Sequence, residues 1–381
     1  MNTRVAAKSD LNTIKNLWEN SRGGGFFTQW FFDKIFYSAN AVVAERDGET
    51  VACACTVPYV MNLNQNNIDV SYIGATVANP ENRIPEVMNT LVADTLGFIA
   101  AKDMPMAFAV PDNYKFLERY GFSTCYGYKQ YDIAPEALPF YGINGTIMRP
   151  KAMDNDVFEM VDSVYRRFTK NKNGYTVRSF ENWKNIFDDF YNNFSGRCVI
   201  YKNHRDEVVG YMLYVIRDNK MGVYELAYSR REGLEGLIGF IQAHKDTVNK
   251  LSLKVPSDDL LYLNFCDSRM AVTECPFAMA RITDAKKILK LYKDNAPENL
   301  RLQIIDRVME SNNKTFTFTD GDLITIDTDA NVATDIGTLT QLVLGYLSVE
   351  EAASLNMIKG DVELLNELFK KQTTYVNMLI C

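Results

Sequence analysis

The chain has 381 residues, a length that corresponds to two to four domains. Its 41 Lys and Arg residues against 48 Asp and Glu residues give a formal net charge of −7, which excludes the basic footprint of an electrostatic nucleic-acid binder. Hydrophobic residues make up 47% of the sequence, enough for packed cores, and no apolar run reaches the ~18 residues that cross a bilayer. Because the first residues also lack the apolar stretch of a signal peptide, we expect a cytoplasmic protein whose partners include neither nucleic acid nor membrane.

Residue types that hold metals or form catalytic triads are scarce. The seven cysteines form no C-x-x-C pair, and the only histidines are His204 and His244. This composition predicts no metal site and gives little support to a Ser–His or Cys–His triad. Any acid–base chemistry is therefore expected to use carboxylates, tyrosines, cysteines or a chain terminus.

The first 130 residues alternate between helical and strand patterns. Apolar residues at helical spacing follow Ser9, and Asp47-Gly48 is a strong turn signal between two β-prone runs. The predicted elements, in order, are a helix after Ser9, a hairpin over 41–57, a strand over 68–78, a helix with an apolar face over 87–98, a strand over 106–110, a short helix over 113–120 and a strand over 123–133.

This order resembles the GNAT acetyltransferase fold. The run Thr76-Val77-Ala78-Asn79-Pro80-Glu81-Asn82-Arg83 resembles the strand end and P-x-x-R that precede the family's cofactor helix. The resemblance implies that acetyl-CoA pairs with main-chain groups of the strand and that its pyrophosphate lies at the helix N-terminus, where free N–H groups and the helix dipole favour anions. The cofactor-binding residues implied are Thr76, Val77, Ala78, Arg83, Ile84, Glu86 and Val87.

Two residues of this loop depart from the family pattern. The family has glycine three positions after the arginine, whereas this chain has Pro85 and Glu86 in that stretch. Pro85 offers no N–H, and Glu86 adds a negative charge near the expected anion. Ser229-Arg230-Arg231-Glu232-Gly233 contains R-x-x-G at the corresponding place in the middle of the chain, so it is an alternative anion site or simply a capped helix start.

Residues 141–275 repeat the pattern of the first part, with a helix over 158–165, strands over 198–201, 208–216 and 223–227, and a helix over 234–241. Residues 276–381 resemble a sterol-carrier-protein-like domain, with strands over 302–305, 315–318 and 323–327 and helices over 338–347 and 362–369. The expected fold class is mixed α+β. The expected domains are 1–140 (GNAT-like), 141–275 (a degenerate second GNAT-like domain) and 276–381 (sterol-carrier-like).

This combination resembles the enhanced intracellular survival (Eis) family of N-acetyltransferases. The best local matches are Met279–Asp284, Thr338–Tyr346 and the ending Tyr375-Val376-Asn377-Met378-Leu379-Ile380-Cys381. The resemblance implies that the free α-carboxylate of Cys381 is the general base of the first domain. An α-carboxyl group with an ordinary pKa near ~3.5 must be desolvated to serve in that role.

The family's general acid is a tyrosine directly after the glycine of the Leu117–Phe122 segment. This chain has Phe122 there, and Leu117 at the position that other GNAT proteins use, so neither offers a proton. Tyr120 is the catalytic candidate that we name in their place, with Tyr114, Thr124 and Cys125 as further nearby groups.

Two functions from different classes follow. The first is an acetyl-CoA-dependent N-acetyltransferase that acts on a primary amine, either aminoglycoside-like or polyamine-like. Its substrate would contact an aromatic run after Gly23-Gly24-Gly25, namely Phe26, Phe27 and Trp30. The second is a catalytically degenerate GNAT scaffold that binds a small or apolar ligand. The family resemblance also implies a homo-oligomer, possibly a hexamer.

Overall fold

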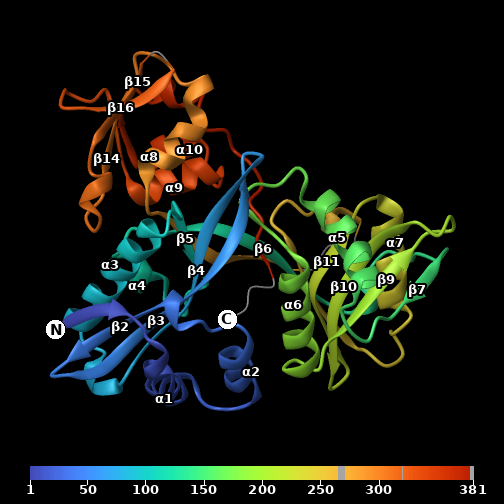
Figure 1. Ribbon diagram of the computed structural model, residues 1–381. Coiled ribbons are helices and arrows are strands. Elements are labelled where there is room, and N and C mark those ends of the chain that lie inside the picture. The colour runs from blue at the N-terminus through green and yellow to red at the C-terminus, as the bar shows by residue number, and fades with distance from the viewer. Residues whose placement is uncertain (265–270, 320, 378–381) are drawn as a thin grey trace. The chain divides into compact units, whose positions relative to one another are not determined.

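The computed structural model describes residues 1–264, 271–319 and 321–377. They form two compact units. Unit 1 contains Met1–Tyr126 and Phe277–Thr374, and unit 2 contains Gly127–Pro276 and the segment that begins at Tyr375. Figure 1 shows the elements along the chain. No described helix is both long and apolar enough to span a membrane.

The N-terminal part of unit 1 is a mixed sheet covered by helices. Its strands lie in the order β1-β2-β3-β4-β5-β13. The elements are β1 (Asn2–Val5), α1 (Leu11–Arg22), α2 (Phe26–Lys34), β2 (Ala41–Arg46), β3 (Glu49–Leu63), β4 (Asn66–Ala78), α3 (Pro85–Ala101), β5 (Met106–Ala109), α4 (Tyr114–Glu118), β6 (Ser123–Ile133) and the later β13 (Val272–Ile282).

Local sequence explains the start of this sheet. Asp47 and Gly48 both have positive φ, as a two-residue hairpin turn requires, and Arg46 pairs with Glu49 across it. The predicted hairpin is therefore confirmed. Ser9, after which the helix was predicted, lies in a short 3-10 helix (Lys8–Asp10), and α1 begins at Leu11 with Asp10 as its N-cap.

The rest of unit 1 contains a five-stranded sheet in the order β16-β15-β14-β17-β18. Its α9 is buried along its whole length and packs on this sheet. A buried ion pair between Arg281 on β13 and Asp306 (2.6 Å) joins it to the N-terminal part. The elements are α8 (Ala285–Leu289), β14 (Arg301–Ile305), β15 (Thr315–Thr319), β16 (Asp322–Ile326), β17 (Val332–Asp335), α9 (Ile336–Leu344), α10 (Val349–Ser354) and β18 (Ile358–Gly360).

Unit 2 repeats the architecture of the N-terminal part of unit 1. Its strands lie in the order β6-β12-β11-β10-β9-β7, and α5, α6 and α7 supply its helical layers. The elements are β7 (Thr146–Met148), α5 (Asn155–Thr169), β8 (Tyr175–Val177), α6 (Phe180–Asn192), β9 (Arg197–Lys202), β10 (Val208–Arg217), β11 (Lys220–Tyr228), α7 (Arg231–Gln242) and β12 (Lys250–Pro256).

Each sheet takes one strand from a distant part of the sequence. In unit 1, β5 pairs antiparallel with β13, where Met279 lies opposite Ala109. In unit 2, β12 pairs antiparallel with β6, where Leu251 lies opposite Ile133. The strand predicted over 123–133 therefore exists, but its second half belongs to the sheet of unit 2.

The mixed α+β class is confirmed, although one predicted helix is wrong and several elements, α6 among them, were not predicted. The helix predicted over 362–369 is wrong, because only Val362–Leu365 forms a short 3-10 helix. Leu365, Leu368 and Phe369 are nevertheless buried, so these apolar residues have the spacing of a helix face although the chain is not helical beyond Leu365. Helix α6 was not predicted, although Ser179 and Asn182 form a capping box at its start.

Candidate active site

The site in unit 1 begins where two parallel strands separate. β4 and β5 pair at Ser71–Ala107 and Tyr72–Phe108. The register between β3 and β4 then shifts, so that Gly74 forms a bulge opposite Cys55 and Thr56. A bulge bends its strand and increases its twist, which moves the end of β4 away from β5.

A cleft of about 480 Å³ lies at this separation. Small-molecule sites occupy roughly 300–1,000 Å³, so the volume suits a substrate arm. β4 contributes Thr76, and Asn113 caps α4 through its side chain. The complete lining is Ser21, Arg22, Ile73, Gly74, Ala75, Thr76, Arg83, Val92, Thr95, Ala109, Val110, Pro111, Asp112, Asn113, Phe116 and Leu117.

Arg83 is held at the cleft by the end of β4. Its Nε donates to the carbonyl oxygen of Ala78 (3.1 Å), and its Nη2 donates to Ser21 Oγ (2.7 Å). Ser21 Oγ also donates to the same Ala78 carbonyl (3.2 Å). These bonds fix the guanidinium and leave donors for an anion, because a guanidinium has five N–H groups.

The predicted strand residues have different environments. Thr76 lines the cleft and is partly exposed. Val77 is buried and lies opposite Cys53 on β3, and it is not among the lining residues. The carbonyl of Ala78 is already engaged by Arg83 and Ser21. Among these three residues, Thr76 is the one that the structure brings to the cleft.

The start of α3 supplies fewer main-chain donors than a helix usually does. Ile84 is the N-cap and Pro85 is the first helical residue. Since proline lacks an N–H, the free donors of this turn reduce to those of Glu86 and Val87. The Glu86 side chain is exposed and Val87 is buried, and neither lines the cleft.

Tyr120 lies in a core beside the cleft rather than in it. Its hydroxyl donates to Asn89 Oδ1 (2.7 Å), and its ring is buried among Leu117, Phe122 and their neighbours. Burial raises its pKa above the ordinary value of a tyrosine. Tyr120 therefore packs behind the cleft wall, against Leu117, and is not itself among the residues that line the cleft.

The three aromatic substrate candidates share α2 but differ in exposure. Phe26 is exposed, Phe27 is partly buried and Trp30 is buried. Phe27 and Trp30 contact each other with ring centroids 5.8 Å apart. The indole N–H of Trp30 is buried without a hydrogen-bond partner in the described part of the chain.

The last predicted catalytic residue, Cys381, lies outside the described residues. Within 1–264, 271–319 and 321–377, no group of three or more His, Cys, Asp or Glu residues is placed to hold a metal ion.

The R-x-x-G turn of unit 2 has a structural explanation. Arg230 forms an ion pair with Glu207 (2.7 Å), which engages its charge. A Cβ at Gly233 would lie 2.2 Å from the carbonyl oxygen of Val209, so glycine lets α7 approach β10. The glycine there serves helix packing on the sheet.

Sequence patterns did not indicate Ser21, Arg22, Asn113 and Phe116, which line the cleft. The end of α1 meets β4 only in the folded chain, more than fifty residues further along. The one available signal was Asn113 as an N-cap before a short helix, a pattern that marks a helix start without identifying a ligand.

Comparisons with known proteins agree with the two repeated sheets. Residues 2–125 and residues 174–282 each match an acetyltransferase (GNAT) domain family, and residues 285–377 match the sterol carrier protein domain family. A search of curated proteins returned no match.

Solved structures resemble the whole chain. A probable N-acyltransferase from Enterococcus faecalis has 21% identity and a TM-score of 0.86, over 99% of this chain and 98% of that one. A GCN5-related N-acetyltransferase from Anabaena variabilis has 15% identity and a TM-score of 0.83, over 98% of both chains. Eis1 from Mycobacterium abscessus has 17% identity and a TM-score of 0.80, over 100% of both chains.

The chain therefore carries two GNAT acetyltransferase domains followed by a sterol carrier protein domain. This whole-chain arrangement is the Eis-like fold.

Proposed function

We propose that this protein is an acetyl-CoA-dependent N-acetyltransferase that transfers an acetyl group to a primary amine of aminoglycoside or polyamine type. The observation that carries the proposal is the open cleft of about 480 Å³ between the separating ends of β4 and β5 in the first GNAT domain. Acetyl-CoA supplies an activated thioester, and the cleft offers a strand edge and two arginines, Arg22 and Arg83, to hold it.

The residues of the cleft fit an extended arm with an anionic end. Thr76 and the neighbouring main chain of β4 line one wall and provide hydrogen-bonding groups. Arg83, fixed by Ala78 and Ser21, provides charge for a phosphate group.

We assign the general base to the α-carboxylate of Cys381, on the strength of the Eis-like domain order. The step that it assists is removal of a proton from the ammonium group of the substrate, which frees the nitrogen lone pair to attack the thioester and displace the thiolate of CoA. We assign protonation of the leaving thiolate to solvent, because the Tyr120 hydroxyl is bonded to Asn89 and its raised pKa makes it a weaker acid.

The amine is expected to approach from α2. Phe26 is exposed there, and the unpartnered indole N–H of Trp30 would be satisfied by a substrate oxygen or by water. A homo-oligomer in the cytoplasm remains part of the proposal, and light scattering of the purified protein would test the oligomer.

The decisive experiment is a calorimetric titration of acetyl-CoA into the full chain with a native, untagged C-terminus. We expect a micromolar Kd that weakens at least 10-fold in Arg83→Gln, with Arg205→Gln as the control at an exposed position of the other unit. Extension of Cys381 by one alanine should preserve binding and abolish acetylation of an aminoglycoside and polyamine panel. Absence of binding at millimolar acetyl-CoA would overturn the proposal.

A second candidate, a GNAT scaffold that binds a ligand without acetyl transfer, is favoured by the cleft itself. No tyrosine is among its lining residues in the described chain, and Pro85 removes one helix donor. This candidate predicts no acetylation of any amine by the unmodified chain and ligand binding that the alanine extension leaves unchanged.

A further inference from the structure

The second GNAT domain has the same strand separation as the first. β11 and β12 pair in parallel from Lys220–Lys250 to Val223–Leu253. The register between β10 and β11 then shifts, so that Tyr224 forms a bulge opposite Leu213 and Tyr214. Tyr224 therefore corresponds to Gly74 of the first domain, and a cleft between β11 and β12 is expected beyond it.

The C-terminal segment of the chain fills this cleft. Tyr375, Val376 and Asn377 line the space together with Leu226 of β11 and the end of β12, and only about 10 Å³ remains empty. All three residues are buried. The amide nitrogen of the Asn377 side chain donates to the carbonyl oxygen of Tyr224 (2.8 Å), so the segment bonds to the bulge itself.

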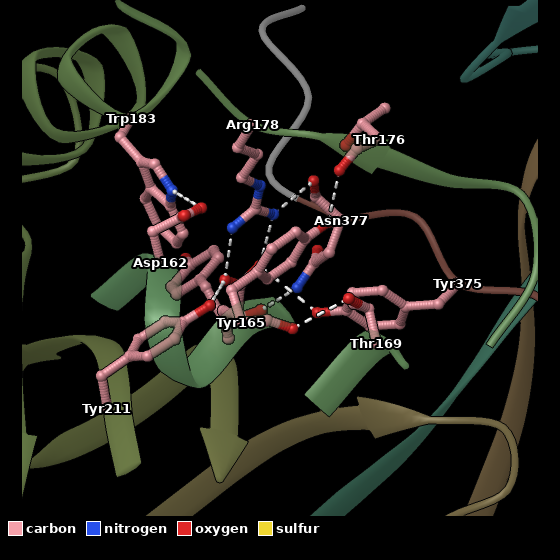
Figure 2. A network of polar contacts seen from close by, with 11 residues as sticks. Asp162, Tyr165, Thr169, Thr176, Arg178, Trp183, Tyr211, Tyr375 and Asn377 are labelled. Carbon is pink, nitrogen blue, oxygen red and sulfur yellow. Dashed lines mark hydrogen bonds and ion pairs between the residues drawn. The ribbon is translucent and has the colours of Figure 1, made fainter. Parts of the chain in front are cut away.

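A buried ion pair holds the segment from the other side. Arg178 donates to both carboxylate oxygens of Glu225, from Nη1 at 2.7 Å and from Nη2 at 2.8 Å. Both side chains are almost completely inaccessible to solvent. Nη2 of Arg178 also donates to the main-chain oxygen of Asn377 (3.0 Å), as Figure 2 shows.

Tyrosines complete the arrangement. The hydroxyl of Tyr211 donates to Glu225 Oε1, and that of Tyr375 donates to Glu225 Oε2 (3.4 Å). The guanidinium of Arg178 lies over the rings of Tyr165 (4.1 Å) and Trp183 (4.5 Å). Figure 2 labels Tyr165, Trp183, Tyr211 and Tyr375 in the network that contains Arg178. We call Arg178, Tyr211, Glu225, Tyr375 and Asn377 the tail anchor.

Chemistry explains why a charged pair occupies this core. An apolar pair of similar volume would be at least as stable as a buried ion pair. An apolar side chain, however, cannot donate to the carbonyl of a chain segment, whereas Arg178 has a donor left after it has bound Glu225. The buried ion pair therefore allows Arg178 to donate a hydrogen bond to the main-chain oxygen of Asn377, although burying the two charges costs free energy.

We propose that the β11–β12 cleft is a binding site for the chain's own C-terminal segment and is thereby closed to acyl-CoA, and that Arg178 is the positioning residue of that segment. Its role in positioning the terminal carboxylate rests on the proposed function. On the proposed function, loss of the tail anchor is expected to slow acetyl transfer while the binding of acetyl-CoA is kept.

The first test is hydrogen exchange of the full chain. The amide of Tyr375 donates to the carbonyl of Asn173 (3.1 Å), so its protection reports the seating of the segment. We expect Asn377→Asp, which sets a carboxylate against the Tyr224 carbonyl, to speed exchange over 375–377 at least 10-fold. Asn249→Asp, at an exposed asparagine of the same unit, is the matched control. Unchanged exchange in Asn377→Asp would overturn the tail anchor.

The second test counts acetyl-CoA sites and measures turnover. One acetyl-CoA per chain agrees with a closed second cleft, and two per chain would overturn it. In Asn377→Asp and Arg178→Lys we expect kcat to fall at least 10-fold while the Kd for acetyl-CoA stays within 2-fold. Faster exchange with an unchanged kcat would contradict the positioning role. Absence of any acetyl-CoA binding would refute the proposed function instead, and hydrogen exchange would still decide the tail anchor.

Discussion

The two GNAT domains share a strand separation that leads to opposite results. In the first domain the bulge residue is Gly74, the next residue is Ala75, and the cleft is open to about 480 Å³. In the second domain the bulge residue is Tyr224, the next residue is Glu225, and the cleft retains about 10 Å³. The same β-bulge therefore leads to an open ligand cleft in one domain and to a seat for the C-terminal segment in the other. The residues at and after the bulge differ between the two domains.

The largest effect is expected when the buried carboxylate of Glu225 is removed from the second GNAT domain. Glu225→Leu leaves Arg178 buried without its counter-ion, which we expect to lower the free energy of unfolding by about 3–5 kcal/mol. Denaturant unfolding followed by the fluorescence of Trp183, which lies against Arg178, measures it. The control Glu207→Leu disrupts an exposed ion pair with Arg230, which is screened by solvent, so its loss of stability should be far smaller. Equal losses in both variants would contradict the role of the buried pair.

The next largest effect is expected at the glycine of the second R-x-x-G turn. A Cβ at Gly233 would meet the carbonyl oxygen and carbon of Val209 at 2.2 and 2.8 Å, and a main-chain carbonyl moves only if the strand moves. We expect Gly233→Ala to cost about 2–3 kcal/mol. In the first domain, Gly97 on α3 has nothing within 4 Å, so Gly97→Ala should stabilise by about 0.5–1 kcal/mol. Thermal unfolding of both variants measures the two changes in stability. An unchanged stability in Gly233→Ala would contradict the packing role of Gly233 and would favour the alternative that this turn is an anion site.

A smaller effect is expected when a side chain is added at the bulge of the open cleft, where the closed cleft has Tyr224. A Cβ at Gly74 would meet Tyr72 at an ordinary contact distance of 3.4 Å, so Gly74→Ala is expected to fold normally. Because Gly74 lines the cleft, we expect acetyl-CoA affinity to fall at least 10-fold, about 1.4 kcal/mol. Calorimetry measures the affinity, with Gly97→Ala as the control. Unchanged affinity in Gly74→Ala would place acetyl-CoA elsewhere.

The smallest expected effect is an opposite response of the two units to acid. Hydrogen bonds from Arg4 and Ala7 lower the pKa of Asp10 in unit 1, so its contribution is present above the unfolded pKa near ~3.9 and is lost as pH falls through the folded pKa. Burial raises the pKa of Asp259 in unit 2, so its contribution is present below ~3.9 and is lost as pH rises through the folded pKa.

At pH 7 we therefore expect Asp10→Asn to destabilise and Asp259→Asn to be neutral or stabilising, each by about 1 kcal/mol or less. The amide oxygen that Asp259→Asn introduces could still accept the hydrogen bonds that Asp259 receives from Tyr131 (2.8 Å) and from the amide of Leu261 (2.8 Å). Unfolding measured at pH 7 and near pH 3 should show both differences shrink in acid. A difference that grows in acid would contradict the pKa shifts.

The sequence predicted the parts of the fold that local patterns determine. The hairpin at Asp47-Gly48 and the amphipathic helix α5 depend on turn chemistry and periodicity, and both are confirmed. The exchange of β6 and β13 between the sheets was not predicted, because strand partners far apart in sequence leave no local signal. Among the site residues, Thr76 and Arg83 were predicted and line the cleft, whereas Arg22 was missed.

The tail anchor could not be derived from the sequence for a related reason. Arg178, Glu225 and Asn377 are separated by dozens of residues, and each reads in isolation as an exposed polar residue. Only the folded unit shows that they are buried together. Hydrogen bonds of Asn377, from Arg178 and to the carbonyl of Tyr224, hold the described end of the chain.

The pairing of β5 with β13 has a consequence for synthesis on the ribosome. Residues 106–109 find their partners at 279–282. At elongation rates of about 5–20 residues per second, that partner strand emerges roughly 10–35 s later. Until then the nascent first sheet presents an unpaired β5 edge, which is a template for wrong pairing. Folding of the first sheet is therefore completed only after most of the chain has been synthesised.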